Sequence, residues 1–288
     1  MLRRNLPVTS GFSSITQNIG SVKNTGLELM FSSKIIDTRD FEWRLGITYA
    51  KNNNEIVDLY GDKEDDVGSE WFIGYPVRVD YRTEYLGVWQ LGEEQEAAVY
   101  DAKPGYPKTR DIENEDAADP KITSLDRQII PLDPDWTGGL NTTFIYKGLS
   151  LDVNVITSQG AKAYTRFMEI DDRFNARWNR VNIPYWTPDN PTNETPMPTA
   201  DITSNLNLNE SDFWLADLSF VRISNINLGY RFPSVVTNSL GVKGLKAYLN
   251  VENPYVWSSF KGMDPETGVQ IDDHPTLTSY QFGVNINF

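Results

Sequence analysis

Carboxylates are the most abundant reactive side chains of this sequence. The chain has 40 Asp and Glu against 26 Lys and Arg, giving a net charge of −14, and its acids are concentrated in three runs at 58–70, 93–126 and 264–273. Glycoside hydrolysis needs two carboxyl groups held about 5–10 Å apart. Acid spread along polar segments brings no particular pair together, so we interpret the runs as solvated loops and name no catalytic residue.

The remaining reactive residue types are scarce. His274, the single histidine, lies between Asp273 and Pro275 in a polar segment, and the chain has no cysteine. The absence of cysteine rules out zinc–thiolate sites, iron–sulfur clusters and disulfides, and the sequence carries neither a G-x-S-x-G elbow nor a phosphate-binding loop. We therefore predict a protein that is not an enzyme and needs no cofactor. Its acidity also argues against a nucleic-acid partner.

An aromatic segment at 178–200 is the best candidate for binding. It contains Trp178, Tyr185 and Trp186 together with prolines at 184, 188, 191, 196 and 198. Prolines restrict the backbone, and the aromatic rings offer flat apolar faces. Such a surface suits stacking on sugar rings or packing against a partner protein, although the rings could equally pack within their own loop.

The segments that must position these loops have a period of two. In 41–49 every odd position is large and apolar and every even one is small or polar, which predicts a β-strand with one apolar and one polar face. The same alternation recurs and gives about eight strands. We place them at 27–31, 41–49, 77–89, 140–146, 149–155, 218–230, 245–251 and 280–288.

The connections between these strands alternate in length. Short ones at 36–40, 146–148 and 233–244 alternate with long polar ones at about 50–76, 90–135, 160–213 and 254–276. Up-and-down outer-membrane barrels have this asymmetry, with short periplasmic turns and long extracellular loops, whereas repeated long loops are uncommon in compact soluble domains. The pattern favours an antiparallel transmembrane barrel. A secreted or surface β-sandwich that binds carbohydrate is the alternative.

Several segments resemble, in order, those of the SusC/RagA-type TonB-dependent outer-membrane transporters. Asn18 to Glu28 resembles that family's N-x-G-x-v-x-N-x-G-x-E segment, and Asp126–Arg127 begins its "DR" motif. The matching segments extend over nearly the whole chain. They are 18–28, 43–56, 74–90, 126–140, 158–160, 218–231, 248–254 and 262–266.

The resemblance implies uptake of large nutrients, such as glycans or peptides, across the outer membrane of a Gram-negative bacterium. In that family a barrel of about 22 strands encloses a plug. A SusD-type surface lipoprotein covers the mouth, and the TonB complex supplies energy. Residues 1–288 would form the C-terminal part, with about eight strands. The plug, the TonB box and the signal peptide are expected upstream, because 1–12 has no apolar signal-peptide core.

Two further expectations follow from the resemblance. Many relatives carry an aspartate-rich, glycine-containing stretch before the "DR" motif that is suited to Ca²⁺. Here Asp111 and Asp116 supply carboxylates but the turn-forming glycine is missing, so a solvated acidic loop is the favoured interpretation. At the other end, outer-membrane barrels commonly finish in an aromatic-terminated strand that the barrel-assembly machinery recognises. We expect this closing strand, facing membrane lipid, to contain Tyr280, Phe282, Val284, Ile286 and Phe288.

Overall fold

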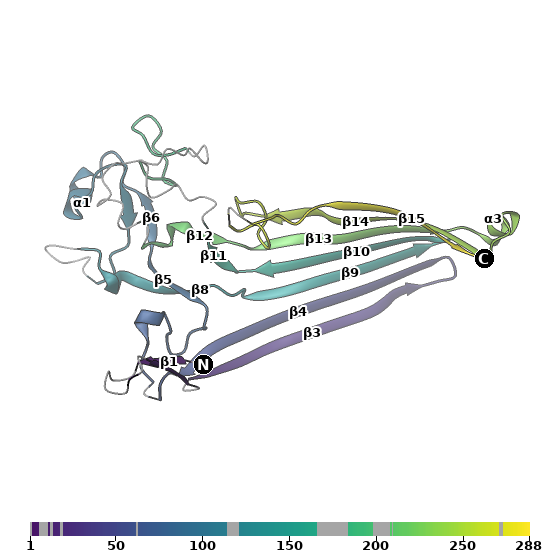
Figure 1. Cartoon of the computed structure of the whole chain (residues 1–288). Coiled ribbons are helices and arrows are strands. Elements are labelled where there is room, and N and C mark those ends of the chain that lie inside the picture. The colour runs from purple at the N-terminus through teal and green to yellow at the C-terminus, as the bar shows by residue number, and fades with distance from the viewer. Residues whose placement is uncertain are drawn as a thin grey trace.

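A long antiparallel sheet dominates the computed structural model of the chain (Figure 1). The structure describes residues 2–5, 11, 14–17, 20–61, 63–113, 121–165, 184–197, 208, 210–270 and 273–288. Seven strands form the sheet in the order β15-β14-β13-β10-β9-β4-β3. Their bounds are β3 (Ser21–Asp37), β4 (Phe41–Asp58), β9 (Trp136–Tyr146), β10 (Leu149–Gln159), β13 (Phe220–Arg231), β14 (Gly244–Ser258) and β15 (Ser279–Asn287).

Short connections join the strands at one end of the sheet, which we call the turn end. β9 and β10 are joined by Lys147 and Gly148, whose φ angles of 46° and 91° are both positive, as a two-residue type I′ hairpin turn requires. A β-carbon on Gly148 would lie 2.7 Å from the carbonyl oxygen of Arg231, so only glycine fits there. β13 and β14 are joined through the short helix α3 (Ser234–Ser239).

Strand register places the large apolar residues on one face of the sheet, the apolar face. Trp43 pairs with Phe144 and Phe144 with Leu151, while Leu249 pairs with both Leu228 and Phe282. This face lacks a covering layer in the described parts of the chain, since Phe31, Phe282 and Tyr280 are 52%, 76% and 74% exposed. A β-sandwich would bury these residues between two sheets, so the sandwich alternative is wrong and the strands have the alternation of a barrel.

The opposite, polar face carries a band of amides and acids that crosses several strands. Asn225 donates to Asn250 at 2.7 Å, and Thr143 donates to Asp152 at 2.7 Å. Asn141 likewise donates to Asn154. Side chains on this face therefore satisfy one another across strands, as polar groups facing a lumen would.

The long connections lie together at the other end, the loop end (Figure 1). They run over 59–135, 160–219 and 259–278. Small sheets and helices form within the first two, and a separate hairpin precedes β3. These elements are β1 (Leu2–Asn5), β2 (Ser14–Gln17), η2 (Val67–Ser69), β5 (Val79–Thr83), β6 (Tyr85–Val88), α1 (Glu94–Val99), β7 (Pro107–Thr109), η3 (Ser124–Asp126), β8 (Arg127–Pro131), β11 (Lys162–Tyr164), η4 (Asp212–Trp214) and β12 (Leu215–Asp217).

One predicted barrel strand is wrong. The segment 77–89 does not enter the long sheet but forms β5, which pairs with β8, and β6, which pairs with β7. Gly87 interrupts the alternation, because its φ is +117° and the register shifts between Tyr85 and Gly87. The predicted loops 50–76 and 90–135 accordingly belong to one longer connection, which begins only at 59 because β4 extends through the predicted loop start to Asp58.

β4 is 18 residues long and β3 is 17, longer than the 9–11 residues that cross a bilayer. Strands of this length continue past an apolar layer into the loop end. No helix in the described ranges is long and apolar enough to span a membrane.

Candidate substrate and partner surface at the loop end

Two of the long connections interlock into one unit, which we call the loop module: the described residues of 59–135 and 160–219. The segment 184–197 docks on β6, β7 and the residues between them. The N–H of Val88 donates to Asn193 Oδ1 at 2.8 Å, and the N–H of Met197 donates to the Gly105 carbonyl at 2.7 Å. These bonds join residues about 100 positions apart, so the segment 184–197 is fixed against the residues of the first long connection.

Trp186 is the residue around which this contact is built. It is 3% exposed, and its indole N–H donates to Gln90 Oε1 at 3.0 Å. Gly105 makes room for it, because a β-carbon there would lie 2.6 Å from the ring. Tyr185 beside it is 46% exposed. Of the predicted aromatic candidates, Trp186 packs within its own loop module, Tyr185 is about half exposed, and Trp178 lies outside the described residues.

Asp111, one of the two calcium candidates, is buried beside Asp126; the other, Asp116, lies outside the described residues. Asp126 is fully buried and accepts hydrogen bonds from the N–H groups of Ile112, Glu113 and Thr123 at 2.7–3.1 Å. No group of three or more possible metal ligands occurs among the residues that the structure describes.

The bonds to Asp126 determine its charge. Burial by itself raises the pKa of this carboxyl, but the three backbone N–H groups, together with a hydrogen bond from the Asp111 side chain, lower it further, and the resulting pKa is below its ordinary value. The aspartate of the "DR" motif is therefore ionised at neutral pH and ties 111–113 to η3.

A buried ion pair fixes the third long connection, 259–278, to the polar face. Arg222 of β13 donates from Nη2 to both carboxylate oxygens of Asp264, at 2.8 and 2.9 Å, and each side chain is 4% exposed. Arg222 Nε has no hydrogen-bond partner and lies 3.5 Å from Glu266 Oε2. Two buried charges in contact restrict the loop to one position, because either one alone would be costly to bury.

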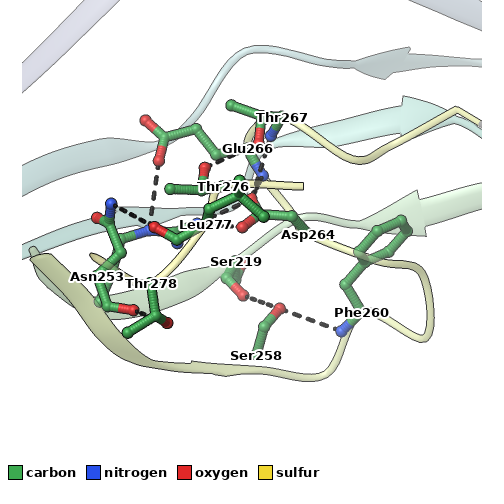
Figure 2. Close-up of polar contacts among 11 residues, drawn as sticks. Ser219, Asn253, Ser258, Phe260, Asp264, Glu266, Thr267, Thr276, Leu277 and Thr278 are labelled. Atoms are coloured by element: carbon green, nitrogen blue, oxygen red, sulfur yellow. Dashed lines mark hydrogen bonds and ion pairs between the residues drawn. The ribbon is translucent and has the colours of Figure 1, made fainter. Parts of the chain in front are cut away.

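Short-range hydrogen bonds shape the rest of this connection (Figure 2). Asp264 Oδ1 accepts from the N–H groups of Glu266 and Thr267, forming a tight turn. Burial raises the pKa of Asp264, but these N–H groups and the Arg222 guanidinium lower it more strongly, so the resulting pKa is below its ordinary value. Where the loop rejoins the strands, Thr278 donates to the Asn253 carbonyl at 2.8 Å.

The turn at 264–268 overhangs a groove on the polar face. The groove has a volume of about 750 Å³ and its walls come from β3, β4, β9, β10 and β13 as well as from the turn. Its lining is mainly apolar but includes two carboxylates, as shown by Met30, Ile156, Phe220, Pro265, Glu28 and Glu266. The in-folded loop thus narrows the polar side of the sheet at the loop end.

Sequence reasoning missed the Arg222–Asp264 pair. The sequence marked Asp264 as part of an acidic run and of a segment resemblance, and Arg222 as one residue of a predicted strand. A cation on the polar face of a partly buried strand indicates an anionic partner, because a buried charge is costly unless it is paired. That partner is 42 residues away, and no spacing rule identifies it.

The predicted closing strand lies where the alternation placed it. β15 is an edge of the seven-stranded sheet, and Tyr280, Phe282, Val284 and Ile286 project from the apolar face. Phe288 follows the strand and is 83% exposed.

Comparison with known proteins shows the same relationship in sequence and in fold. The chain is 27% identical over 320 residues to the TonB-dependent receptor P3 of Formosa agariphila, which covers 99% of this chain and 30% of that receptor. It is 26% identical over 304 residues to the TonB-dependent receptor SusC of Bacteroides thetaiotaomicron, covering 98% and 28%. The chain thus spans about 30% of the length of these curated relatives. No family model matches it.

Solved structures agree. The RagAB peptide transporter superposes with a TM-score of 0.75 at 25% identity, over 99% of this chain and 31% of that one. The "closed-closed" state of the RagAB peptide importer gives 0.72 at 26%, over 98% and 31%. Sequence and fold therefore both support a SusC/RagA-type TonB-dependent receptor fragment that forms part of a larger barrel.

Proposed function

We propose that this chain forms part of an outer-membrane importer for large nutrients such as glycans or peptides. The observation that carries the proposal is the asymmetry of the sheet: one face is apolar and uncovered, and the other is polar and carries the in-folded loop 259–278. A barrel wall with lipid outside and a solute path inside has this arrangement. The relatives named as TonB-dependent receptors and as a peptide transporter support the same function.

The proposed partners are substrate, a SusD-type lipoprotein, the TonB complex and membrane lipid. At the loop end, the loop module offers Tyr185 and its neighbours to substrate or to a SusD-type lipoprotein. TonB would act through a part of the receptor that this chain does not contain, and the apolar face would contact membrane lipid.

Uptake by the receptor that contains this chain tests the proposal. We expect the receptor in outer-membrane fractions, with heat-modifiable mobility on gels, and uptake of labelled oligosaccharide or peptide that stops when TonB is deleted. Tyr185→Ala should lower uptake or lipoprotein binding without changing the amount of folded receptor. A receptor recovered as a water-soluble monomer that binds sugar would refute the proposal.

We also propose that β15 is the closing strand and the segment read by the barrel-assembly machinery. Its exposed apolar face and edge position support this role. Phe288→Asp should reduce membrane insertion in cells, while Asn287→Asp, one position earlier and of the opposite alternation, should have little effect. Equal insertion of the wild type and Phe288→Asp would contradict the assignment.

A further inference from the structure

The turn end of the sheet differs in charge from the rest of the chain. The connections 38–40, 147–148 and 232–243 contain the cations Arg39, Lys147 and Lys243 but only one acid, Asp40, in a chain of net charge −14. Arg231 and Lys246 adjoin them on facing strands, while the adjoining acids Asp37 and Glu42 pair with Lys34 and Arg44. We call Arg39, Lys147, Arg231, Lys243 and Lys246 the basic rim.

Backbone hydrogen bonds hold the basic rim together across the strands. The N–H of Lys147 donates to the Asp40 carbonyl at 3.2 Å, and the N–H of Arg231 donates to the Gly148 carbonyl at 2.8 Å. Further along, the N–H of Lys243 donates to the Asn287 carbonyl at 2.7 Å. The cations therefore lie in one row at the turn end rather than on independent loops.

Two members of the rim lie on the side of the apolar face. Lys147 Nζ is 5.2 Å from the centroid of the Tyr146 ring, and Tyr146 belongs to the apolar face. Lys243 precedes apolar-face Leu245 by two positions and is exposed. Arg231 and Lys246 pair across the polar face instead. Lys147 and Lys243 thus mark the line where the apolar face ends.

The Lys147 ammonium lies over the Tyr146 ring at the edge of the apolar face. From such an edge position the long lysine side chain can extend to a membrane's headgroup layer. On the apolar face between the two lysines, Leu149 is 42% exposed and Tyr230 38%. A ligand that fits must present an apolar chain beside the sheet and an anion at the rim. An acidic protein would match the charge but leave this apolar strip uncovered.

We propose that Lys147 and Lys243 bind the headgroups of anionic phospholipids in the leaflet that surrounds the turn end. The proposal rests on the membrane-embedded barrel of the preceding section. Lys147 lies in the β9–β10 turn and Lys243 immediately precedes β14, with β10 and β13 between them. Neighbouring strands are about 4.8 Å apart, so each lysine takes its own headgroup and the two act additively.

Lipid binding by the folded receptor that contains this chain tests the proposal. In detergent micelles with phosphatidylglycerol as the probe, native mass spectrometry should show weaker lipid retention for Lys147→Gln and for Lys243→Gln. The expected loss is about fivefold for each and about 25-fold for the double variant, from roughly 1 kcal/mol per lysine at a lipid surface. Phosphatidylcholine should be retained less well by the wild type and show little change in the variants.

Lys51→Gln is the matched control. Lys51 pairs with Leu27 on the apolar face but lies toward the loop end, so its loss should leave phosphatidylglycerol retention unchanged. Three results would overturn the proposal: a double variant that retains this lipid like the wild type, an equal loss in Lys51→Gln, or displacement of the lipid by inorganic phosphate. A receptor that is not in the membrane at all would refute the proposed function instead, and gel mobility and fractionation show which has failed.

Discussion

Arg222 and Asp264 illustrate how single residues control the loop end. Each is buried and charged, so removing one leaves the other without compensation. We expect Arg222→Leu to favour opening of 259–278 by about 3–5 kcal/mol. Limited proteolysis and hydrogen exchange within that loop would measure the change. The double variant Arg222→Met/Asp264→Leu removes both charges and should largely restore protection of the loop. An unprotected loop in the double variant would mean that the hydrogen bonds between the two side chains hold the loop in place, rather than the avoidance of a single buried charge.

The same pair makes a prediction about pH. The pKa of Asp264 is lower in the folded protein than its ordinary value. A carboxyl with a lowered pKa stabilises the fold at pH values above its unfolded pKa, and this stabilisation is lost as the pH falls through the folded pKa. Protection of 259–278 from exchange should therefore be constant from pH 7 to about 5 and decline below about 4. Asp264→Asn should be less protected at neutral pH and show a smaller decline on acidification; an unchanged decline would assign the effect to another group.

Trp186 and Tyr185 separate stability from binding at adjacent positions. Trp186 is buried against Gly105, and removing a buried Trp side chain costs about 3–5 kcal/mol. Trp186→Ala should loosen the loop module and expose 184–197 to protease. Tyr185→Ala removes a half-exposed ring and should cost much less, about 1 kcal/mol or below, so protease resistance should stay near that of the wild type. Equal resistance of both variants would show that the segment is held by its backbone bonds alone.

Individual strands were predictable from the sequence wherever one face is apolar. Alternation located 41–49, 140–146 and 280–288 because a two-residue period admits only one assignment of faces. It failed at 77–89, whose alternating residues pack inside the loop module. Periodicity indicates that a segment has two unlike faces but does not say which sheet receives it. The role of single residues in the site was less predictable. The sequence singled out Trp186 as an aromatic candidate but left open whether its ring binds a ligand or packs within its loop. Its burial depends on Gly105, which lies 81 positions earlier.

The two faces of β15 give a test of membrane orientation. Phe282 lies on the apolar face, and its neighbour Gln281 on the polar face. Lysine on the lipid side of a barrel strand costs about 2–4 kcal/mol near the bilayer midplane, whereas lumen positions tolerate it. Phe282→Lys should therefore lower the free energy of unfolding from lipid vesicles by an amount in that range, and Gln281→Lys should change it little. A larger cost for Gln281→Lys would reverse the assignment of the faces.

At the scale of the whole molecule, the described sheet is an open wall. β3 and β15 are its two edges, and the buried hydrophobic residues lie mostly in the loop module rather than against the sheet. A barrel removes its edges by closing, and lipid covers its outer face. The architecture could be anticipated from strand alternation and loop asymmetry, but closure could not, because it depends on strands outside this chain.

This open wall determines how residues 1–288 should behave when expressed alone. Unpaired edge N–H and C=O groups, together with the exposed apolar face, favour association both at the edges and across the face. We expect aggregates in water by light scattering and no heat-modifiable band after transfer to detergent. Co-expression with the remaining strands of the same receptor should restore a closed, heat-modifiable barrel, since pairing then satisfies both edges. A stable monomer of 1–288 in water without detergent would show that the apolar face finds cover within this chain, and the lipid-facing assignment would have to be abandoned.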